Sequence, residues 1–304
     1  MKITFLGTTA MVPTRERNHS SIYLEYKGEG ILIDAGEGTQ RQLRIKGIPV
    51  TKVKKILITH WHGDHVLGLL GIIQSLGANH YTETLNIFGP KGSKEYLNHL
   101  LKGVSIRHLI NLNVEEISKG IFFKNENYKL EAFPLKHSAS CLAYKFIEND
   151  KRNINLDYTK KFGLEKDPIL GKLQKGKDIV YDGHKISVKQ GTILKKGKVI
   201  SFVIDTKYFK EINKFVKDSD YLISEGTLLE EHKNPEHLTA KEAAKMAKDS
   251  KVKNLILTHF SQRYKSVDEL EKEAKAVFKN TKLAYDFMEI IIWHKDSPSQ
   301  LIFL

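Results

Sequence analysis

Short apolar stretches separated by turn-forming residues make up the beginning of the chain. Residues 2–6, 21–25 and 30–34 have the length and composition of β-strands in an antiparallel arrangement. Farther along, residues 56–58 form an apolar run typical of a buried strand, and the apolar-rich stretch from residue 65 to residue 76 indicates a helix. The pattern therefore predicts an antiparallel opening followed by further strands and helices.

The second half of the chain echoes two of these segments. Phe202–Thr206 is similar to Ile31–Ala35, and Lys253–His259 is similar to Lys54–His60. Strands share a composition, so chance alone can produce such echoes. Their common order, with Asp after one strand and Thr-His after the next, favours two related halves around one site.

Two helices of the second half are predicted from their first turns. Thr239 with Glu242, and Ser266 with Glu269, have capping-box spacing before helix-forming residues. Alternating strands and helices predict a layered α/β protein. The 304 residues suffice for one large domain or two smaller ones, each with a substantial core.

Residues 148–200 differ in character from the rest of the chain. They contain 13 Lys and Arg against 7 Asp and Glu, a local charge of +6, with Gly and Asn scattered among them. This composition predicts a mobile, basic insertion whose hairpin-like stretches stand off the main body.

The overall charge indicates an acidic partner. Lys and Arg number 49 against 36 Asp and Glu, which gives a net charge of +13. Nucleic acid or an anionic membrane would satisfy it, although many soluble proteins with such a balance bind neither. Charge alone leaves these alternatives open.

Compartment and disulfide chemistry are limited by a few features. The first ten residues lack the apolar centre of a signal peptide, and the longest apolar stretch, Val66–Ile73, is far shorter than the roughly 20 residues that cross a membrane. Cys141 is the only cysteine, so no intrachain disulfide forms. We therefore expect a cytoplasmic protein without membrane contact, in which any metal is bound by His and carboxylates.

A dense cluster of metal-binding residue types follows the strand at residues 56–58. His60, His62, Asp64 and His65 lie within six residues. Imidazole nitrogens and carboxylate oxygens suit zinc, manganese or iron, and a loop can direct alternate side chains towards two adjacent ions. A solvated His-rich loop is the less favoured alternative, because the preceding strand is buried.

A two-metal site needs further ligands, including a carboxylate that can bridge the ions. Asp205, His259 and His137 each closely follow an apolar, strand-like stretch. Each one alone would more often be a structural residue than a ligand. Together they supply the missing number of ligands.

These residues lie in a chain that resembles ribonuclease Z, the tRNA 3′-processing endonuclease of the metallo-β-lactamase superfamily. The histidine cluster is typical of the superfamily, whereas the opening segment, the loop with Gln40 and the Ser-x-Arg-Tyr ending are typical of ribonuclease Z. The matching segments span nearly the whole chain: Phe5–Thr8, Pro13–Asn18, Asp34–Gln40, Pro134–Ser138, Asp205–Thr206 and Leu257–Tyr264.

The resemblance implies a fold and a ligand set. The fold is an α/β, αββα four-layer sandwich with a protruding basic arm, in which residues 1–304 form a single domain and residues 148–200 a flexible, tRNA-binding arm. The site would hold two Zn²⁺ per subunit, with Mn²⁺ also suitable. One ion would be bound by His60, His62 and His137, the other by Asp64, His65 and His259, with Asp205 as the bridge.

The resemblance also implies partners and catalytic roles. The substrate would be precursor tRNA, cut to leave a tRNA 3′-OH, and the protein would be a homodimer. Asp64 would take a proton from the attacking water and His237 would protonate the leaving oxygen, while Asp34 would orient a ligand imidazole. Arg263 follows His259 closely enough to approach a substrate phosphate, unless it is a surface arginine paired with a carboxylate.

The chain departs from the ribonuclease Z pattern in two places. Ser224–Thr227 stands where many members have His-Glu-Ala-Thr, so Glu225 is retained and the preceding histidine is not. This change weakens the expected support of His237 by Glu225. In the insertion, residues 166–172 replace a segment richer in Gly and Pro, so the arm's contacts with tRNA do not carry over.

Three alternative functions share the same residues. The nearest is a phosphodiesterase or exonuclease of the same fold that acts on other RNA or on small phosphodiesters. A redox protein with iron in this ligand frame is less favoured, because no segment suggests a flavin-binding module. An RNA-binding module without catalysis is disfavoured by the intact ligand positions.

Overall fold

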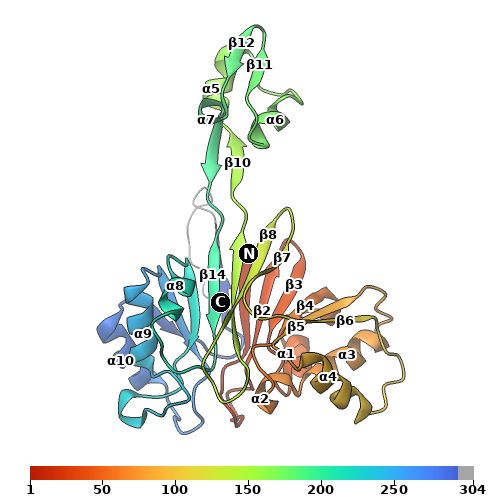
Figure 1. Ribbon diagram of the computed structural model, residues 1–304, viewed down its shortest axis with the longest axis vertical. Coiled ribbons are helices and arrows are strands. Elements are labelled where there is room, and N and C mark those ends of the chain that lie inside the picture. Colours follow the sequence, from red (N-terminus) through yellow and green to blue (C-terminus); the bar gives the residue numbers. More distant parts are fainter. Residues whose placement is uncertain (294–304) are drawn as a thin grey trace.

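The computed structural model describes residues 1–293, which contain two seven-stranded sheets that face each other (Figure 1). The first sheet has the order β18-β1-β2-β3-β4-β5-β6. Its strands are β1 Lys2–Gly7, β2 Ser21–Tyr26, β3 Glu29–Ile33, β4 Val53–Leu57, β5 Leu85–Gly89, β6 Leu112–Glu116 and β18 Glu289–Ile291. β1, β2 and β3 pair antiparallel, which confirms the antiparallel opening, and β3 to β6 pair parallel.

The second sheet has the order β17-β16-β15-β14-β9-β8-β7. Its strands are β7 Gly120–Lys124, β8 Tyr128–Pro134, β9 Leu142–Glu148, β14 Val199–Val203, β15 Tyr221–Glu225, β16 Asn254–Thr258 and β17 Thr281–Leu283. β7, β8, β9 and β14 pair antiparallel, and β14 to β17 pair parallel. Each sheet therefore joins an antiparallel part to a parallel part.

The shared plan of the sheets refines the comparison between the two halves. β4 is the parallel neighbour of β3, whereas β16 is separated from β14 by β15. The similar segments 54–60 and 253–259 therefore contain strands, β4 and β16, that occupy different positions in their sheets. β15, which ends at Glu225, takes the position in its sheet that β4 takes in the first.

Helices cover the outer faces of both sheets and complete the four-layer αββα sandwich (Figure 1). On the first sheet lie α1 Thr39–Ile45, η1 Val50–Lys52, α2 Gly63–Val66, α3 Leu69–Ala78 and α4 Ser93–Lys102. On the second lie α8 Ile212–Val216, η3 Glu230–His232, α9 Ala240–Asp249 and α10 Asp268–Val277. Within residues 1–293, no helix has the length and apolar character needed to cross a bilayer.

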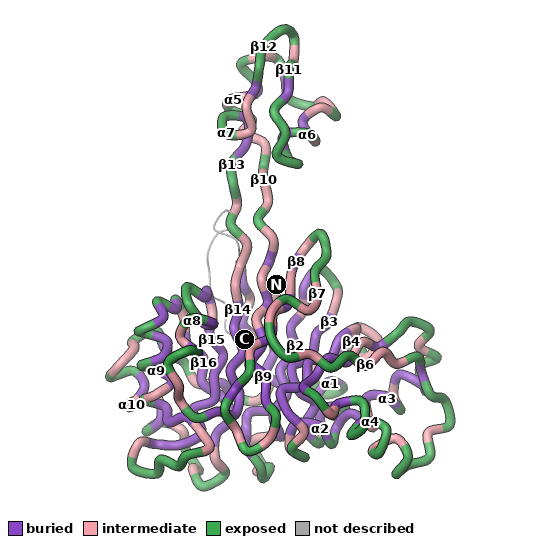
Figure 2. The backbone as a smooth tube through the Cα atoms, in the orientation of Figure 1, coloured by how far each residue is buried: buried purple, intermediate pink, exposed green. Residues whose placement is uncertain are grey.

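The apolar core is divided among the layers. Phe5 and Leu24 of the first sheet pack between the sheets with Tyr144, Phe146 and Phe202 of the second. Two further apolar clusters lie beneath the helices, one on the outer face of each sheet. Figure 2 shows this burial concentrated in the body of the molecule. Burying both faces of each sheet leaves the ends of its strands free to carry polar groups.

The helix expected over residues 65–76 is two helices, α2 and α3, separated at Leu67 and Gly68. The Gly68 N–H donates to the carbonyl oxygen of Ala35 at 2.9 Å. A Cβ atom at Gly68 would lie only 2.1 Å from the carbonyl oxygen of Gly36. Glycine is required for this close approach of two backbones, which fixes the start of α3 to the loop after β3.

One of the two predicted capping boxes is confirmed. The Thr239 hydroxyl accepts from the backbone N–H of Glu242, and the Glu242 carboxylate accepts from the N–H of Thr239. The second is wrong, because Val267 precedes α10 and Ser266 accepts only from the N–H of Asp268. Three acidic side chains in the first turn of α10 instead complement the positive end of the helix dipole.

The segment between β9 and β14 projects far from the body (Figure 1). Its stem is the antiparallel pair β10 Lys151–Ile154 and β13 Thr192–Lys195. Its tip contains α5 Leu156–Thr159, η2 Lys160–Phe162, α6 Leu170–Gln174, β11 Ile179–Tyr181, β12 His184–Ile186 and α7 Val188–Gly191. The tip buries an apolar cluster of its own: Leu164, Leu170, Leu173, Ile179 and Ile186.

The separate core of the arm predicts that the body folds without it. Residues 151–195 can be replaced by Asn-Gly, a two-residue hairpin turn, because Lys151 and Lys195 pair antiparallel, which makes Asp150 and Lys196 the next opposed residues; their side chains form an ion pair. We expect the melting temperature of the body to change by less than about 4 °C, since few contacts are lost. Thermal melts followed by circular dichroism, with size-exclusion chromatography, measure this. Aggregation or loss of the cooperative transition would show that the body depends on the arm.

Candidate metal centre

A pocket of about 170 Å³ lies where strands of both sheets end. The histidines and aspartates that the sequence singles out gather around it. They form overlapping groups whose ligand atoms lie within 4.8 Å of one another: His60, His62 and His137; His60, His65 and Asp205; Asp64, His65 and His259. The structure thus brings together every side chain that the resemblance implies as a metal ligand.

These side chains come from four separate loops at the ends of strands. The cluster from His60 to His65 follows β4 and continues into α2. His137 follows β8, Asp205 follows β14 and His259 follows β16. Both sheets therefore contribute, which confirms that the two halves meet at one site.

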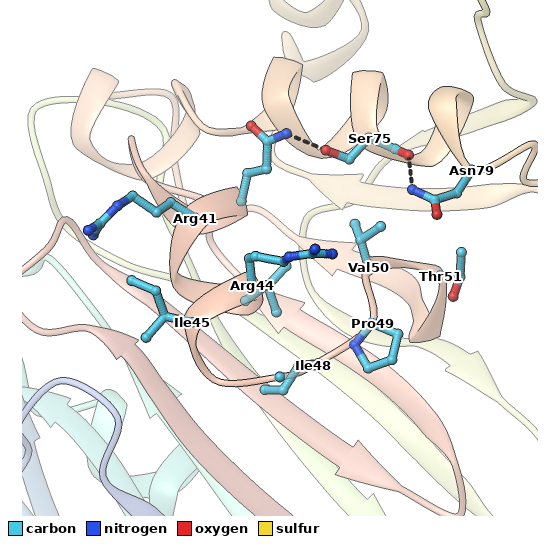
Figure 3. A pocket seen from close by; sticks show the side chains of 12 residues that line it. Arg41, Arg44, Ile45, Ile48, Pro49, Val50, Thr51, Ser75 and Asn79 are labelled. Atoms are coloured by element: carbon cyan, nitrogen blue, oxygen red, sulfur yellow. Dashed lines mark hydrogen bonds between the residues drawn. The ribbon is translucent and has the colours of Figure 1, made fainter.

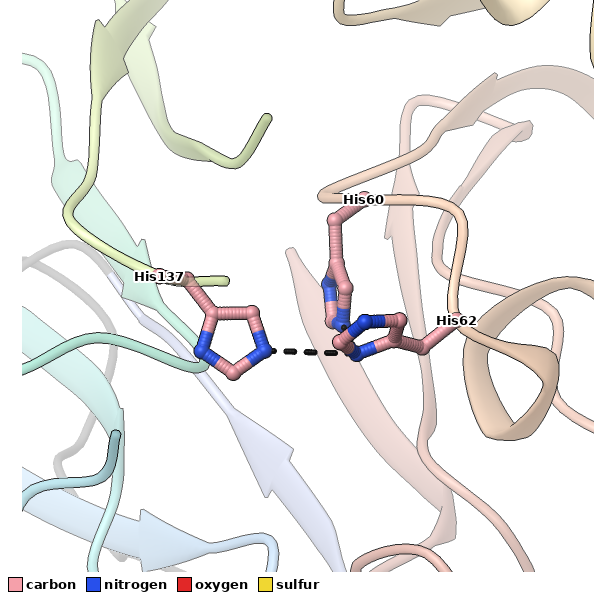
Figure 4. A group of neighbouring side chains, drawn as sticks. All are labelled: His60, His62 and His137. Carbon is pink, nitrogen blue, oxygen red and sulfur yellow. Dashed lines mark hydrogen bonds between the residues drawn. The ribbon is translucent and has the colours of Figure 1, made fainter. Parts of the chain in front are cut away.

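Imidazole nitrogens face one another across the pocket. Nε2 of His60 lies 3.0 Å from Nδ1 of His62, which in turn lies 3.3 Å from Nε2 of His137 (Figure 4). On the other side, Nε2 of His65 lies 3.2 Å from Nε2 of His259. A proton can be shared by only two nitrogens, whereas a cation can be bound by several lone pairs at once. The arrangement therefore fits cation ligands.

Asp205 lies between the two histidine groups. Its Oδ2 atom is 3.3 Å from Nε2 of His60 and 3.2 Å from Nε2 of His65. Its Oδ1 atom is buried and lies 2.9 Å from Nδ1 of His259, but it accepts no well-aligned hydrogen bond from residues 1–293. Burial favours the protonated acid, yet the neighbouring histidines hold the pKa of Asp205 well below its usual range. A buried, ionised carboxylate with an unsatisfied oxygen suits a metal bridge.

The first half of the site is held from behind by the buried carboxylate of Asp34. Its Oδ1 accepts from the backbone N–H of Thr59, and its Oδ2 accepts from the Thr59 hydroxyl and from Nδ1 of His65, each at 2.7 Å. The same hydroxyl lies 3.0 Å from Nδ1 of His60. Asp34 and Thr59 therefore bind the Nδ1 side of both rings and leave each Nε2 facing the pocket.

Glu225 performs the equivalent task in the second half. It is fully buried, and its Oε2 accepts from the Thr227 hydroxyl at 2.6 Å. That hydroxyl lies 3.1 Å from Nδ1 of His259. Oε1 of Glu225 accepts from the backbone N–H of Thr206 at 2.5 Å, which fixes the residue after Asp205. Carboxylate, threonine and imidazole thus repeat the order seen with Asp34.

His237 is bound directly by Glu225. Its Nδ1 lies 3.0 Å from Oε2 of Glu225 and 3.4 Å from Oδ1 of Asp205. Burial disfavours the charged imidazole, but these two carboxylates raise the pKa of His237 to about 11. Ser224, which departs from the family pattern, turns its buried hydroxyl to the carbonyl oxygen of Glu225. Glu225 therefore supports His237 without the missing histidine.

The opening segment covers the pocket from the other side. The backbone N–H of Met11 donates to Oδ2 of Asp64 at 2.8 Å. Asn18 fixes this segment, because its N–H donates to Asp286 and its side-chain amide donates to the carbonyl oxygen of Glu37, each at 2.7 Å. This part of the resemblance thus has a structural role in placing Asp64.

Arg17 fixes the same segment to the far end of the chain. Its guanidinium donates to the carbonyl oxygens of Tyr264 at 2.8 Å and Ser261 at 3.5 Å. Arg17 lies within the Pro13–Asn18 segment of the family resemblance, but the sequence pattern indicates no role for its side chain. The Ser-x-Arg-Tyr ending that follows His259 therefore supplies backbone acceptors that position the opening segment.

Arg263 is not brought into the pocket. Its side chain is exposed and does not line the cavity. Within residues 1–293 it forms no ion pair, so the alternative of a surface pair is not observed either. Glu236, which received no role from the sequence, does line the pocket, and its carboxylate accepts from the N–H of Ser138 at 3.1 Å.

Comparison with known proteins places the chain in a family. The family model described as anti-Pycsar protein Apyc1 matches residues 1–283. Ribonuclease Z of Methanothermobacter thermautotrophicus is 38% identical over 98% of each chain, and that of Methanococcus maripaludis is 40% identical over 90% of this chain and 92% of its own.

Solved structures agree with this placement. Human tRNase Z, short form, superposes with a TM-score of 0.70 at 25% identity, covering 96% of this chain and 100% of that one. The metallo-β-lactamase fold protein YhfI from Bacillus subtilis has a TM-score of 0.70 at 18% identity, covering 95% and 98%. The predicted fold class is confirmed, and the chain belongs to the ribonuclease Z family of metallo-β-lactamase fold proteins.

Proposed function

We propose that this protein is a metal-dependent endoribonuclease that removes the 3′ trailer from precursor tRNA and leaves a tRNA 3′-OH. One observation carries the proposal: Oδ2 of Asp205 lies between two groups of imidazoles in a chain related to ribonuclease Z along its length. Phosphodiester hydrolysis at two adjacent metals requires such a bridged pair of sites.

The donor set fits two divalent cations. Five imidazoles and two carboxylates suit Zn²⁺, and Mn²⁺ is compatible with the same atoms. The proposed ligands are His60, His62 and His137 for one ion, Asp64, His65 and His259 for the other, and Asp205 for both. When bound, the cations would supply Lewis acidity that activates water and neutralises charge on the phosphoryl oxygens.

Two residues are proposed to move protons. Asp64 takes a proton from the attacking water, and the Met11 N–H holds its Oδ2 in place for this. His237 is bound through Nδ1 by Glu225, which leaves Nε2 for the leaving oxygen of the tRNA. Glu225 is thus a positioning residue for the proton donor.

The arm is proposed to bind tRNA outside the site. Its lysines, including Lys172, Lys175 and Lys177, suit backbone phosphates and do not read sequence. Arg263, exposed beyond the pocket, is proposed to contact another tRNA phosphate. Because the arm extends away from its own body, we propose a cytoplasmic homodimer in which each arm serves the partner's site (Figure 1).

Incubation with a 3′-extended tRNA tests the proposed substrate. We expect a single cut after the discriminator nucleotide, whereas degradation at random positions would contradict an endonuclease of this specificity. The variant with residues 151–195 replaced by Asn-Gly should lose at least about 100-fold in precursor cleavage, since several phosphate contacts are removed. It should retain hydrolysis of bis(p-nitrophenyl) phosphate. Survival of both activities would favour the small-phosphodiester alternative, and equal loss of both would show that the deletion disturbs the metal centre and would not support tRNA binding by the arm.

Replacement of Asp34 by Asn tests the support of the metal ligands. Asn tolerates the positive φ of 60° at this position but presents an amide group where the carboxylate accepts three hydrogen bonds. We expect zinc affinity to fall about 10- to 100-fold, measured by competition with a chromophoric chelator. Asp150→Asn on the arm is the matched control. Unchanged zinc affinity in a folded Asp34→Asn variant would show that Asp34 does not support the proposed metal ligands.

Substrates with different leaving groups test the role of His237. In His237→Ala, precursor cleavage should fall about 10²- to 10⁴-fold, because the ribose oxygen needs a proton to leave. Hydrolysis of bis(p-nitrophenyl) phosphate should change little, since nitrophenolate leaves without protonation. The exposed His99 provides the control variant His99→Ala. An equal fall for both substrates would indicate a structural role instead.

A further inference from the structure

A second cavity of about 280 Å³ opens beside the metal pocket. It is lined by Lys136, His137, Ser138, Lys207, Pro235 and Glu236. Three of these residues, His137, Ser138 and Glu236, also line the metal pocket, so the two cavities share a wall. Whatever enters this cavity lies next to a group bound at the metal centre.

Two lysines stand in this cavity on backbone segments that are fixed to each other. The N–H of Lys207 donates to the carbonyl oxygen of Lys136 at 3.0 Å, and the N–H of Lys136 donates to the Thr206 hydroxyl at 3.1 Å. Lys136 directly precedes His137, and Lys207 follows Asp205 by two residues. The lysines are therefore held at a set position relative to the proposed metal ligands.

Neither lysine is neutralised by the part of the chain that the structure describes. Both side chains are exposed, and within residues 1–293 neither ammonium group forms an ion pair. Nζ of Lys136 lies 4.8 Å from the centre of the Phe209 ring, a cation–π contact that places the ammonium without cancelling its charge. The cavity therefore presents two unpaired positive charges to its contents.

The cavity wall contains one carboxylate, and it is already engaged. Oε2 of Glu236 accepts from the backbone N–H of Ser138 at 3.1 Å and lies 3.5 Å from Nδ1 of His137. The backbone carbonyl of Glu236 also lies 3.3 Å from that nitrogen. Glu236 is thus bound to the ligand loop, and the two lysines outweigh its charge.

We propose that the Lys136–Lys207 cavity binds the RNA phosphate next to the scissile one and so positions the chain for cleavage. The inference rests on the proposed function. The metal pocket of about 170 Å³ has little room beyond the reacting phosphate, so the neighbouring phosphodiester lies outside it. Two ammonium groups bind such a monoanion as point charges and read no base, so the site is independent of sequence.

Alanine variants with two substrates test the lysine site. Lys136→Ala and Lys207→Ala should each lower kcat/KM for precursor tRNA about 10-fold, with KM raised. Each should reduce the slope of log kcat/KM against log salt by about 1. Hydrolysis of bis(p-nitrophenyl) phosphate should not change, because this ester has no neighbouring phosphate. Lys217→Ala, at an exposed lysine after α8, is the matched control.

A neutral phosphate analogue locates the contact. Synthetic precursors carry one methylphosphonate, either immediately 5′ or immediately 3′ of the scissile phosphate. At one of the two positions, the methylphosphonate should lower kcat/KM of the wild type by about the same factor as a lysine substitution does with the normal substrate. The lysine variants should show no further decrease in kcat/KM with that analogue. Lys136→Arg and Lys207→Arg retain the charge and should recover most of the activity.

Other outcomes separate this inference from the proposed function. The phosphate site would be overturned, and the proposed endonuclease left intact, by either of two results. One is that the lysine substitutions and both analogues lower kcat/KM additively; the other is that the lysine variants have the same kcat/KM as Lys217→Ala. A parallel fall in nitrophenyl ester hydrolysis would show that the substitutions disturb the metal centre and would also overturn it. A wild-type enzyme that cleaves no precursor tRNA would overturn the proposed function, and this inference with it.

Discussion

Two buried carboxylates, Asp34 and Glu225, hold the site in a form that its ligands would not adopt alone. Rings and acids crowded into one pocket would otherwise satisfy each other through hydrogen bonds, and their lone pairs would be lost to a cation. Asp34 limits this by binding Nδ1 of His65 directly and Nδ1 of His60 through Thr59, which keeps both Nε2 atoms directed into the pocket. Ring orientation is thereby decided behind the pocket, before any ion arrives.

Glu225 extends the same control to catalysis. It joins three groups with separate tasks: the backbone after Asp205, the Thr227 hydroxyl beside His259, and Nδ1 of His237. The proposed bridge, the proposed ligand His259 and the proposed proton donor therefore share one buried anchor. Asp34 follows β3, whereas Glu225 ends β15, the counterpart of β4, so the two anchors come from non-equivalent strands on opposite sides of the pocket.

The proposed chemistry and the proposed binding of tRNA occupy different parts of the molecule. The body buries both faces of its sheets and places reactive groups at strand ends, whereas the arm has a small core of its own and exposes its basic surface. The opening segment links distant parts of the body, since Arg17 binds the loop after His259 while Met11 caps Asp64. Lys136 and Lys207 line the cavity between the pocket and solvent, where the proposed cleavage site adjoins the proposed RNA-binding surface.

The sequence by itself determined the strands of the opening and, through its resemblance to ribonuclease Z, the four-layer fold and the proposed ligand residues. Strand signals and the spacing of His60, His62, Asp64 and His65 are local, so they can be read from neighbouring residues. The start of a helix was harder to predict, as at Ser266. There, acidic side chains in the first turn of α10 complement the helix dipole and substitute for a capping side chain.

Only the tertiary structure decided which nitrogen of each ring faces the pocket, that Glu225 binds His237 without help from Ser224, and that Arg263 lies outside. Ring orientation, for example, depends on pairs from different elements, such as Asp34 with His65, separated by 31 positions, and Thr227 with His259, separated by 32. No local pattern encodes such contacts, since they arise when the packing of both sheets brings their strand ends together.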